Sequence, residues 1–196
     1  MAILKILTTG NPVLRKKTNE VKTIDEDILR LIEDMSDTMK AAGGLGLAAN
    51  QVGVLKRLIL IDAGYLRYDE AIEKGENPPP PQFEPVAMIN PAIESKEGCT
   101  SIMEGCLSVP GYRAEVERAV NITYSYTDIN GKRIVDKAEN LAAIAIQHEI
   151  DHLDGILFID RISNLKKNIA IKKVKKYLEQ IEENGDPVES ALYGKS

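Results

Sequence analysis

The stretch His148-Glu149-Ile150-Asp151-His152 contains both histidines of the chain. Residues four apart on an α-helix lie on one face, so the two imidazoles could bind a single metal ion. A glutamate directly after the first histidine stands where a metal-bound water needs its general base. The alternative is a pair of solvated surface histidines. We favour the metal site because residues 141–146 are apolar and predict a buried helix, on which these polar groups would need partners.

A catalytic metal site commonly has three protein ligands and one position open to water. Cys106 is the strongest candidate for the third ligand, because a thiolate binds zinc or iron well and the glycine before it lets the backbone approach an ion. Cys99 is predicted to be a small buried hydrophobic residue. A disulfide between the two cysteines is the alternative, but it would consume the ligand. Two cysteines are more typical of a reducing compartment.

Three segments, in this order, resemble the peptide deformylases, whose pattern is GxGxAAxQ, then EGCLS, then HExDH on a helix. The chain has GLGLAANQ at 44–51, EGCLS at 104–108 and HEIDH at 148–152. The resemblance spans roughly residues 3–162. It departs from the family at Gly43, where many relatives have an acidic residue, in a longer segment at 63–85, and in the basic tail. None of these departures touches the predicted ligands.

The chemistry can be assigned to individual residues. Cys106, His148 and His152 would hold the ion, which lowers the pKa of a bound water toward about 7. Glu149 would take the proton of that water and later deliver it to the leaving amine. An oxyanion needs further donors, each typically worth about 3 kcal/mol of barrier. The resemblance supports the two candidates for this role, which are the side-chain amide of Gln51 and the backbone N–H of Leu107.

The resemblance implies that the N-terminal formyl group is removed from formyl-methionine of newly synthesised polypeptides, releasing formate. An apolar pocket for the methionine side chain and backbone groups that pair the substrate as an added strand are then expected. The candidates for these contacts are Leu45, Gly46, Gly105, Leu141, Ile144 and Ala145. Ordinary core packing would explain the same residues, and periodicity alone does not separate the two interpretations.

Two arginines between the second motif and the following hairpin have separate predicted roles. Asp151 lies on a helix predicted to be buried and needs a cation or several donors. We expect it to be structural and to pair with Arg118, while Arg113 faces the substrate channel.

Two other functions fit parts of this pattern. A zinc peptidase shares HExxH but would take its third ligand from downstream, where the acids Glu179, Glu182 and Glu183 sit in a lysine-rich tail. A structural metal site with an RNA-docking helix is the other alternative. Glu149 argues against it, because a structural site has no use for a free carboxylate beside its ion.

Ligand chemistry and resemblance differ on the metal. Two imidazoles and one thiolate favour zinc, whereas the resemblance implies one Fe²⁺ per chain, with Zn²⁺, Ni²⁺ or Co²⁺ able to occupy the site.

A net charge of −5 argues against a nucleic-acid-binding protein. The chain has no apolar run near the roughly 18 residues that span a bilayer and no secretory signal at its start. We therefore predict a cytoplasmic protein.

Patterning predicts the elements that position these residues. They form a single α+β domain over 1–196, with antiparallel or mixed sheets packed around a central metal-binding helix. The segment 63–85, with its four prolines, is predicted to be a surface loop with at most a helical turn near 68–74; a domain linker is the alternative. The expected elements are a helix at 25–42 with a Thr23/Glu26 capping box, strands at 57–62 and 86–93, a hairpin of 121–128 and 132–136 around a two-residue Asn130-Gly131 turn, and the central helix at 140–155.

A last amphipathic helix is predicted at 164–183. Its apolar side would consist of Leu165, Ile169, Val174, Leu178 and Ile181, with the lysines elsewhere. The lysines are Lys166, Lys167, Lys172, Lys173, Lys175 and Lys176. They form either a solvated basic face or a docking surface for an anionic partner such as RNA, and the ribosome is a plausible partner because the family's substrate emerges from it.

Overall fold

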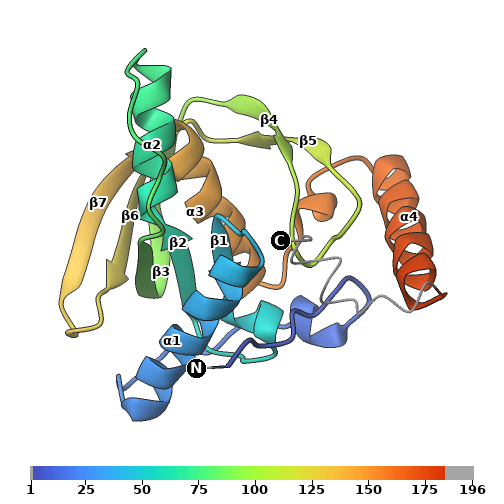
Figure 1. Cartoon of the computed structure of the whole chain (residues 1–196), viewed down its shortest axis with the longest axis horizontal. Coiled ribbons are helices and arrows are strands. Elements are labelled where there is room, and N and C mark those ends of the chain that lie inside the picture. Colours follow the sequence, from blue (N-terminus) through green and yellow to red (C-terminus); the bar gives the residue numbers. More distant parts are fainter. Residues whose placement is uncertain (1, 184–196) are drawn as a thin grey trace.

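The computed structural model describes residues 2–183 and has two antiparallel sheets (Figure 1). The predicted α+β class is confirmed. The five-stranded sheet has the order β1-β2-β3-β6-β7, and β4 pairs with β5 in the second sheet. The strands are β1 Gly46–Ala48, β2 Leu58–Asp62, β3 Pro85–Glu97, β4 Thr100–Glu104, β5 Ala114–Arg118, β6 Asn121–Thr127 and β7 Arg133–Glu139. The helices are α1 Glu26–Ala41, α2 Ala63–Glu73, α3 Asn140–Leu153 and α4 Asn164–Glu183, with short 3₁₀ helices η1 Pro12–Arg15, η2 Ala49–Val52 and η3 Phe158–Asp160.

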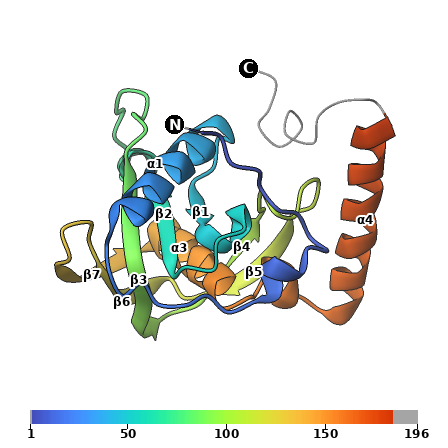
Figure 2. The ribbon, with the colours of Figure 1, turned by 90° about the horizontal axis from the view of Figure 1, so that it is seen from below.

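The inner strand β2 is buried on both faces, as its sequence predicts. Alternate residues of a strand point to opposite sides. Ile59 and Ile61 therefore join the apolar cluster that contains α3, while Leu58 and Leu60 join the cluster that contains α1. The two helices thus cover opposite faces of the sheet, and α3 is central, as predicted (Figure 2).

The first helix has nearly the predicted extent but a different cap. The side chain of Asp25 accepts a hydrogen bond from the Ile28 N–H at 3.0 Å, which satisfies one of the free donors of the first turn. The predicted capping box of Thr23 and Glu26 is therefore wrong.

The segment 63–85 is not a loop throughout, and the predicted surface loop is wrong for its first half, where α2 forms. Asp62, at the end of β2, caps this helix by accepting from Gly64 N and Tyr65 N at 3.0 and 3.2 Å. Pro85 then pairs directly with Asp62 in the adjacent strand. The segment therefore connects two neighbouring strands, and the domain-linker alternative is also wrong.

The hairpin between β6 and β7 has a longer turn than predicted. Thr127 pairs with Arg133, and Asp128 N donates to Lys132 O at 2.9 Å. Gly131 has a φ of +80°, which closes a three-residue turn in place of the expected two-residue one.

The sequence patterning did not predict the small sheet of β4 and β5. Cys99, which precedes it, is exposed, so its predicted burial is wrong, and both cysteines are free thiols.

The C-terminal helix has the predicted bounds and lies at one side of the molecule, away from the five-stranded sheet (Figures 1 and 2). Its buried side consists of Ala170, Val174 and Ile181. Leu165 and Ile169 are exposed, contrary to the prediction, because α4 packs only a narrow stripe against η3 and the residues after β4. None of the helices in the described part of the chain is long and apolar enough to cross a membrane.

Candidate metal centre and active site

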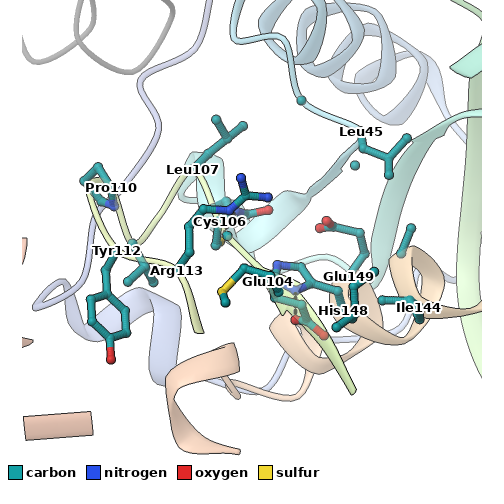
Figure 3. Close-up of a pocket in the computed structure, with 18 of the residues that line it drawn as sticks. Leu45, Glu104, Cys106, Leu107, Pro110, Tyr112, Arg113, Ile144, His148 and Glu149 are labelled. Carbon is teal, nitrogen blue, oxygen red and sulfur yellow. Dashed lines mark hydrogen bonds and ion pairs between the residues drawn. The ribbon is translucent and has the colours of Figure 1, made fainter. Parts of the chain in front are cut away.

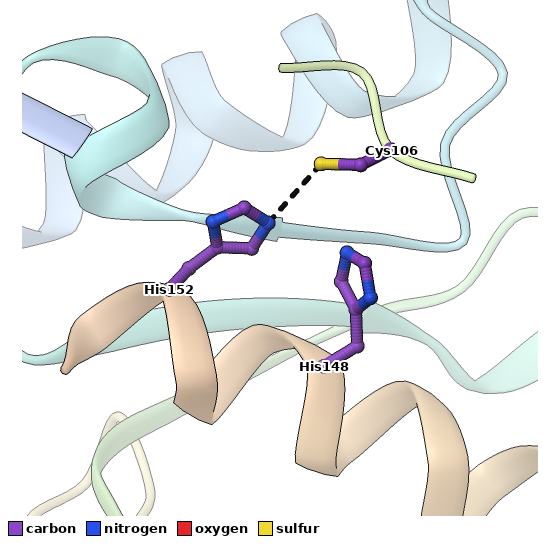
Figure 4. A group of neighbouring side chains, drawn as sticks. All are labelled: Cys106, His148 and His152. Atoms are coloured by element: carbon purple, nitrogen blue, oxygen red, sulfur yellow. Dashed lines mark hydrogen bonds between the residues drawn. The ribbon is translucent and has the colours of Figure 1, made fainter. Parts of the chain in front are cut away.

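The structure brings together the three predicted metal ligands (Figure 4). His148 and His152 project from adjacent turns of α3, and Cys106 lies in the loop after β4. Their ligand atoms lie within 4.8 Å of one another, and Cys106 Sγ is 3.2 Å from His152 Nε2. Three converging nitrogen and sulfur donors at this spacing fit a single four-coordinate ion with one open position.

His148 is held in place by two neighbours. Its Nδ1 lies 2.7 Å from Glu104 Oε2, and its ring stacks on Phe158 with centroids 6.3 Å apart. A carboxylate on one imidazole nitrogen fixes the ring and directs the other nitrogen toward an ion. The pattern EGCLS contains Glu104, but sequence reasoning gave this residue no role.

The metal-binding helix is tied to the small sheet by buried ion pairs. Arg118 on β5 donates to both carboxylate oxygens of Glu104, at 2.6 and 3.0 Å, and to Asp151 Oδ2 at 2.5 Å. The predicted pairing of Asp151 with Arg118 is confirmed. Arg161 is a second partner of Asp151, also at 2.5 Å, which sequence spacing did not indicate. Burial favours protonation of Glu104, but the donors on Arg118 and His148 outweigh it and lower its pKa to about 2.

Glu149 has the environment of a general base. Its side chain is buried beside the ligands, and within residues 2–183 its Oε2 has no hydrogen-bond partner. Burial raises the pKa of Glu149 to about 7, so the carboxyl can both accept and release a proton near neutrality. Its Oε1 approaches the backbone so closely that a β-carbon at Gly46 would lie 2.6 Å away.

Gln51 on η2 points its amide toward the thiol. Its Oε1 accepts from Ala48 N at 2.8 Å, which leaves the NH₂ group to donate to Ser108 Oγ at 3.1 Å. The same Nε2 is 3.6 Å from Cys106 Sγ. Ser108, the last residue of EGCLS, thus orients a predicted catalytic group, a role that sequence reasoning missed.

These groups open into a cavity of about 680 Å³ (Figure 3). Cys106 and His148 line the cavity, whereas His152 is fully buried and does not. Every other predicted site residue also lines the cavity, namely Leu45, Gly46, Gln51, Gly105, Leu107, Arg113, Leu141, Ile144, Ala145 and Glu149. Residues that sequence reasoning did not propose complete the wall, among them Ile102, Pro110, Tyr112 and Tyr177.

Comparison with known proteins identifies the family. The model of the polypeptide deformylase family matches residues 3–168. The chain is 45% identical over 177 residues to a peptide deformylase of Rhizobium meliloti, covering 90% of this chain and 94% of that protein. The chain belongs to the peptide deformylase family. It is therefore a metallo-hydrolase that removes the N-formyl group from nascent peptides, and the zinc-peptidase and non-enzymatic alternatives are excluded.

Solved deformylases share its fold. A crystal structure from Legionella pneumophila has 41% identity and a TM-score of 0.79, covering 91% of this chain and 97% of that one. A structure from Ehrlichia chaffeensis in complex with actinonin has 39% identity and a TM-score of 0.79, covering 90% and 98%.

The electrostatics of the ligand set determine when an ion can bind to this deformylase. Burial lowers the pKa of His152 well below its usual value, which keeps the imidazole neutral. Burial acts the same way on His148, but hydrogen bonds to Cys106 and Glu104 outweigh it and raise its pKa. An ion that binds here must displace the proton of His148, so its affinity should increase with pH.

Proposed function

We propose that this deformylase works with Fe²⁺ held by Cys106, His148 and His152, and that Zn²⁺, Ni²⁺ or Co²⁺ can replace it. Two imidazoles and a thiolate suit any of these borderline cations, and the family resemblance favours iron. Metal analysis of protein purified without oxygen, paired with formate release by each metal form, tests the assignment. An anaerobic preparation that carries zinc alone at full activity would contradict it.

We further propose that Glu149 transfers the protons of the reaction. When bound, the ion supplies a Lewis acid and an activated water. Glu149 removes a proton from the attacking water and later donates it to the departing amine nitrogen. The single observation that carries this role is a buried carboxylate, unpaired within the described residues and with a pKa near 7, beside the metal ligands.

Gln51 and Leu107 would stabilise the oxyanion that develops from the formyl oxygen. The hydrogen bond between Gln51 Oε1 and Ala48 N fixes which end of the amide faces the thiol, so its N–H groups are oriented before substrate binds. The backbone N–H of Leu107 follows the ligand Cys106 directly. Such preorganised donors act where charge appears during the reaction.

The substrate backbone would bind between the two sheets. Within the described residues, β1 pairs only with β2, and β4 only with β5, so each has a free edge on the cavity wall, at Gly46 and near Gly105 respectively. An extended peptide can add as a strand to such edges. The methionine side chain would then enter the apolar end of the cavity, formed by Leu45, Leu141, Ile144 and Ala145.

Glu149→Gln tests the proposal for the general base. This change keeps the size of the side chain, so the variant should retain its metal while formate release from a formyl-methionyl peptide falls about 10²- to 10⁴-fold. Cys106→Ala is the matched comparison, because it should lose the metal itself. Unchanged formate release by the metal-loaded Glu149→Gln variant would refute the role of Glu149.

We also propose that the enzyme acts in the cytoplasm and docks on the ribosome through α4. On α4, Leu165, Ile169, Lys172 and Lys176 are exposed and, at helical spacing, share the face opposite the buried stripe. A surface that combines basic and apolar side chains suits the RNA and protein of a ribosomal exit site.

A further inference from the structure

One residue of the C-terminal helix reaches the active site. Among the described residues of α4, Tyr177 alone lines the cavity. Its ring lies flat against the backbone at Gly111, where a β-carbon would be 2.9 Å from Tyr177 Cγ and 3.1 Å from Cδ2. Gly111 also has a φ of +71°, so two independent constraints favour glycine at this position.

The position of Tyr177 is fixed by the packing of α4. Ala170 and Val174 are fully buried in an apolar cluster that includes Val109 and Phe158 from the site. Lys173 Nζ lies 5.8 Å from the centre of the Tyr112 ring, which holds the helix against the loop after Cys106. Tyr177 remains half-buried, so part of its ring faces the cavity.

The two ends of the cavity differ in chemistry (Figure 3). Leu45 and Ile144 lie at the right of the view, and Pro110 and Tyr112 lie at the left, with Cys106 and Arg113 between them. Successive side chains of an extended peptide point to opposite sides. A peptide whose methionine enters the apolar end therefore directs its second side chain past Arg113 and toward the opposite end, where Tyr112 lies and where Tyr177 packs on Gly111.

We propose that Tyr177 is a specificity-determining residue that contacts the second side chain of the formylated peptide and favours an aromatic residue there. Aromatic rings pair well with a tyrosine ring, and the nearby guanidinium of Arg113 adds a cation–π contact. The inference rests on the proposed placement of methionine. It makes α4 part of substrate selection as well as a candidate docking helix.

The test compares two substrates, formyl-methionyl-phenylalanine amide and formyl-methionyl-glycine amide. The quantity measured is the ratio of their kcat/KM values, each from formate release by the metal-loaded enzyme. Tyr177→Ala should lower this ratio about three- to tenfold, mainly through KM for the aromatic substrate. Tyr177→Phe keeps the ring and should restore the ratio.

Ile181→Ala is the control for a structural effect. Ile181 is buried one turn further along the same helix, lies outside the cluster that fixes Tyr177 and does not line the cavity, so this variant should lower Tm and leave the ratio unchanged. An unchanged ratio in Tyr177→Ala, or an equal fall in Ile181→Ala, would overturn the proposal. Failure of the wild-type enzyme to release formate from either substrate would instead contradict the activity that family membership gives this chain.

Discussion

At the residue scale, Gly46 sets the position of the proposed base. Its missing side chain leaves the space that the Glu149 carboxylate occupies, since a β-carbon there would be 2.6 Å from Oε1. Sequence reasoning assigned Gly46 to backbone pairing with the substrate and did not detect this contact. Both roles are compatible, because they use different atoms of the same residue.

Gly46→Ala should therefore displace Glu149 while leaving the metal ligands in place. We expect kcat/KM to fall about 10²-fold, since a misplacement of about 1 Å at a reacting group has effects of this size. Metal content, measured alongside, should stay at one ion per chain. Gly44→Ala is the comparison: its β-carbon would meet Leu107 Cδ1 at 3.1 Å and the Gly46 carbonyl oxygen at 3.3 Å, contacts that need a shift of only a few tenths of an ångström, so the reduction should be much smaller. Equal reductions in the two variants would contradict the proposed positioning by Gly46.

The candidate site was predictable wherever chemistry is encoded in local spacing. His148 and His152 are one helical turn apart, and this spacing alone indicated a shared ion. Glu104 and Ser108 were present in a quoted motif, yet their roles depend on partners brought near by folding. Tyr177 carries no local signal, because it reaches the cavity only through the packing of α4.

At the element scale, prediction succeeded for helices with strong patterns and failed for weakly patterned elements. The bounds of α4 and the position of α3 follow from long periodic segments. The short helix α2 is weakly amphipathic and precedes a run of prolines. For these two reasons the sequence pattern did not predict it. The strands β4 and β5 have only one buried side each, and Val116 alone is β-branched on that side of β5.

Two substitutions test whether α1 is capped by the observed residue or by the predicted one. Asp25→Ala removes the acceptor for Ile28 N–H and should lower the free energy of unfolding by about 1 kcal/mol. Thr23→Ala should change it by much less, although the sequence pattern assigned the cap to Thr23. Urea unfolding of the two variants measures both values. A larger effect at Thr23 than at Asp25 would restore the predicted capping box.

At the scale of the whole molecule, a buried ion-pair network joins elements that are distant in the sequence. Glu104 on β4, Arg118 on β5 and Asp151 on α3 hold the small sheet against the metal-binding helix. Arg161 extends the network to the segment after η3. Truncating any member would leave a buried charge without its partner, which is costly.

This network should make stability depend on pH. The folded protein holds the pKa of Glu104 at about 2, below the usual 4.5, so the unfolded chain binds the proton more readily. The contribution is present in full above pH 4.5 and is lost as pH falls toward 2, by up to about 3 kcal/mol. Urea unfolding of metal-free protein should show that Glu104→Gln is less stable than wild type at pH 7 and that the gap narrows between pH 4.5 and 2. A difference in stability between the two proteins that does not change with pH would contradict the low pKa of Glu104.

The distribution of charge over the whole molecule bears on ribosome docking. The chain is acidic overall, with a net charge of −5, so a general attraction to RNA is not expected. Binding should therefore depend on the exposed lysines of α4. Deleting the helix would expose the core that Ala170 and Val174 cover, so charge reversal on its solvent face is the cleaner change.

The double variant Lys172→Glu/Lys176→Glu should co-sediment with ribosomes less than wild type at low salt. The dependence of its binding on salt should also be weaker, by about one unit of slope for each phosphate that the variant no longer neutralises. Formate release from a free formyl-methionyl peptide should not change, because neither lysine lines the cavity.

Lys16→Glu/Lys17→Glu makes the same change in net charge at exposed positions near η1 and is the matched control for the α4 variant. If both double variants bind ribosomes equally poorly, the attraction comes from net charge alone and α4 is not a docking surface. If only the α4 variant binds poorly, the helix that supplies Tyr177 to the cavity also places the enzyme beside the emerging peptide.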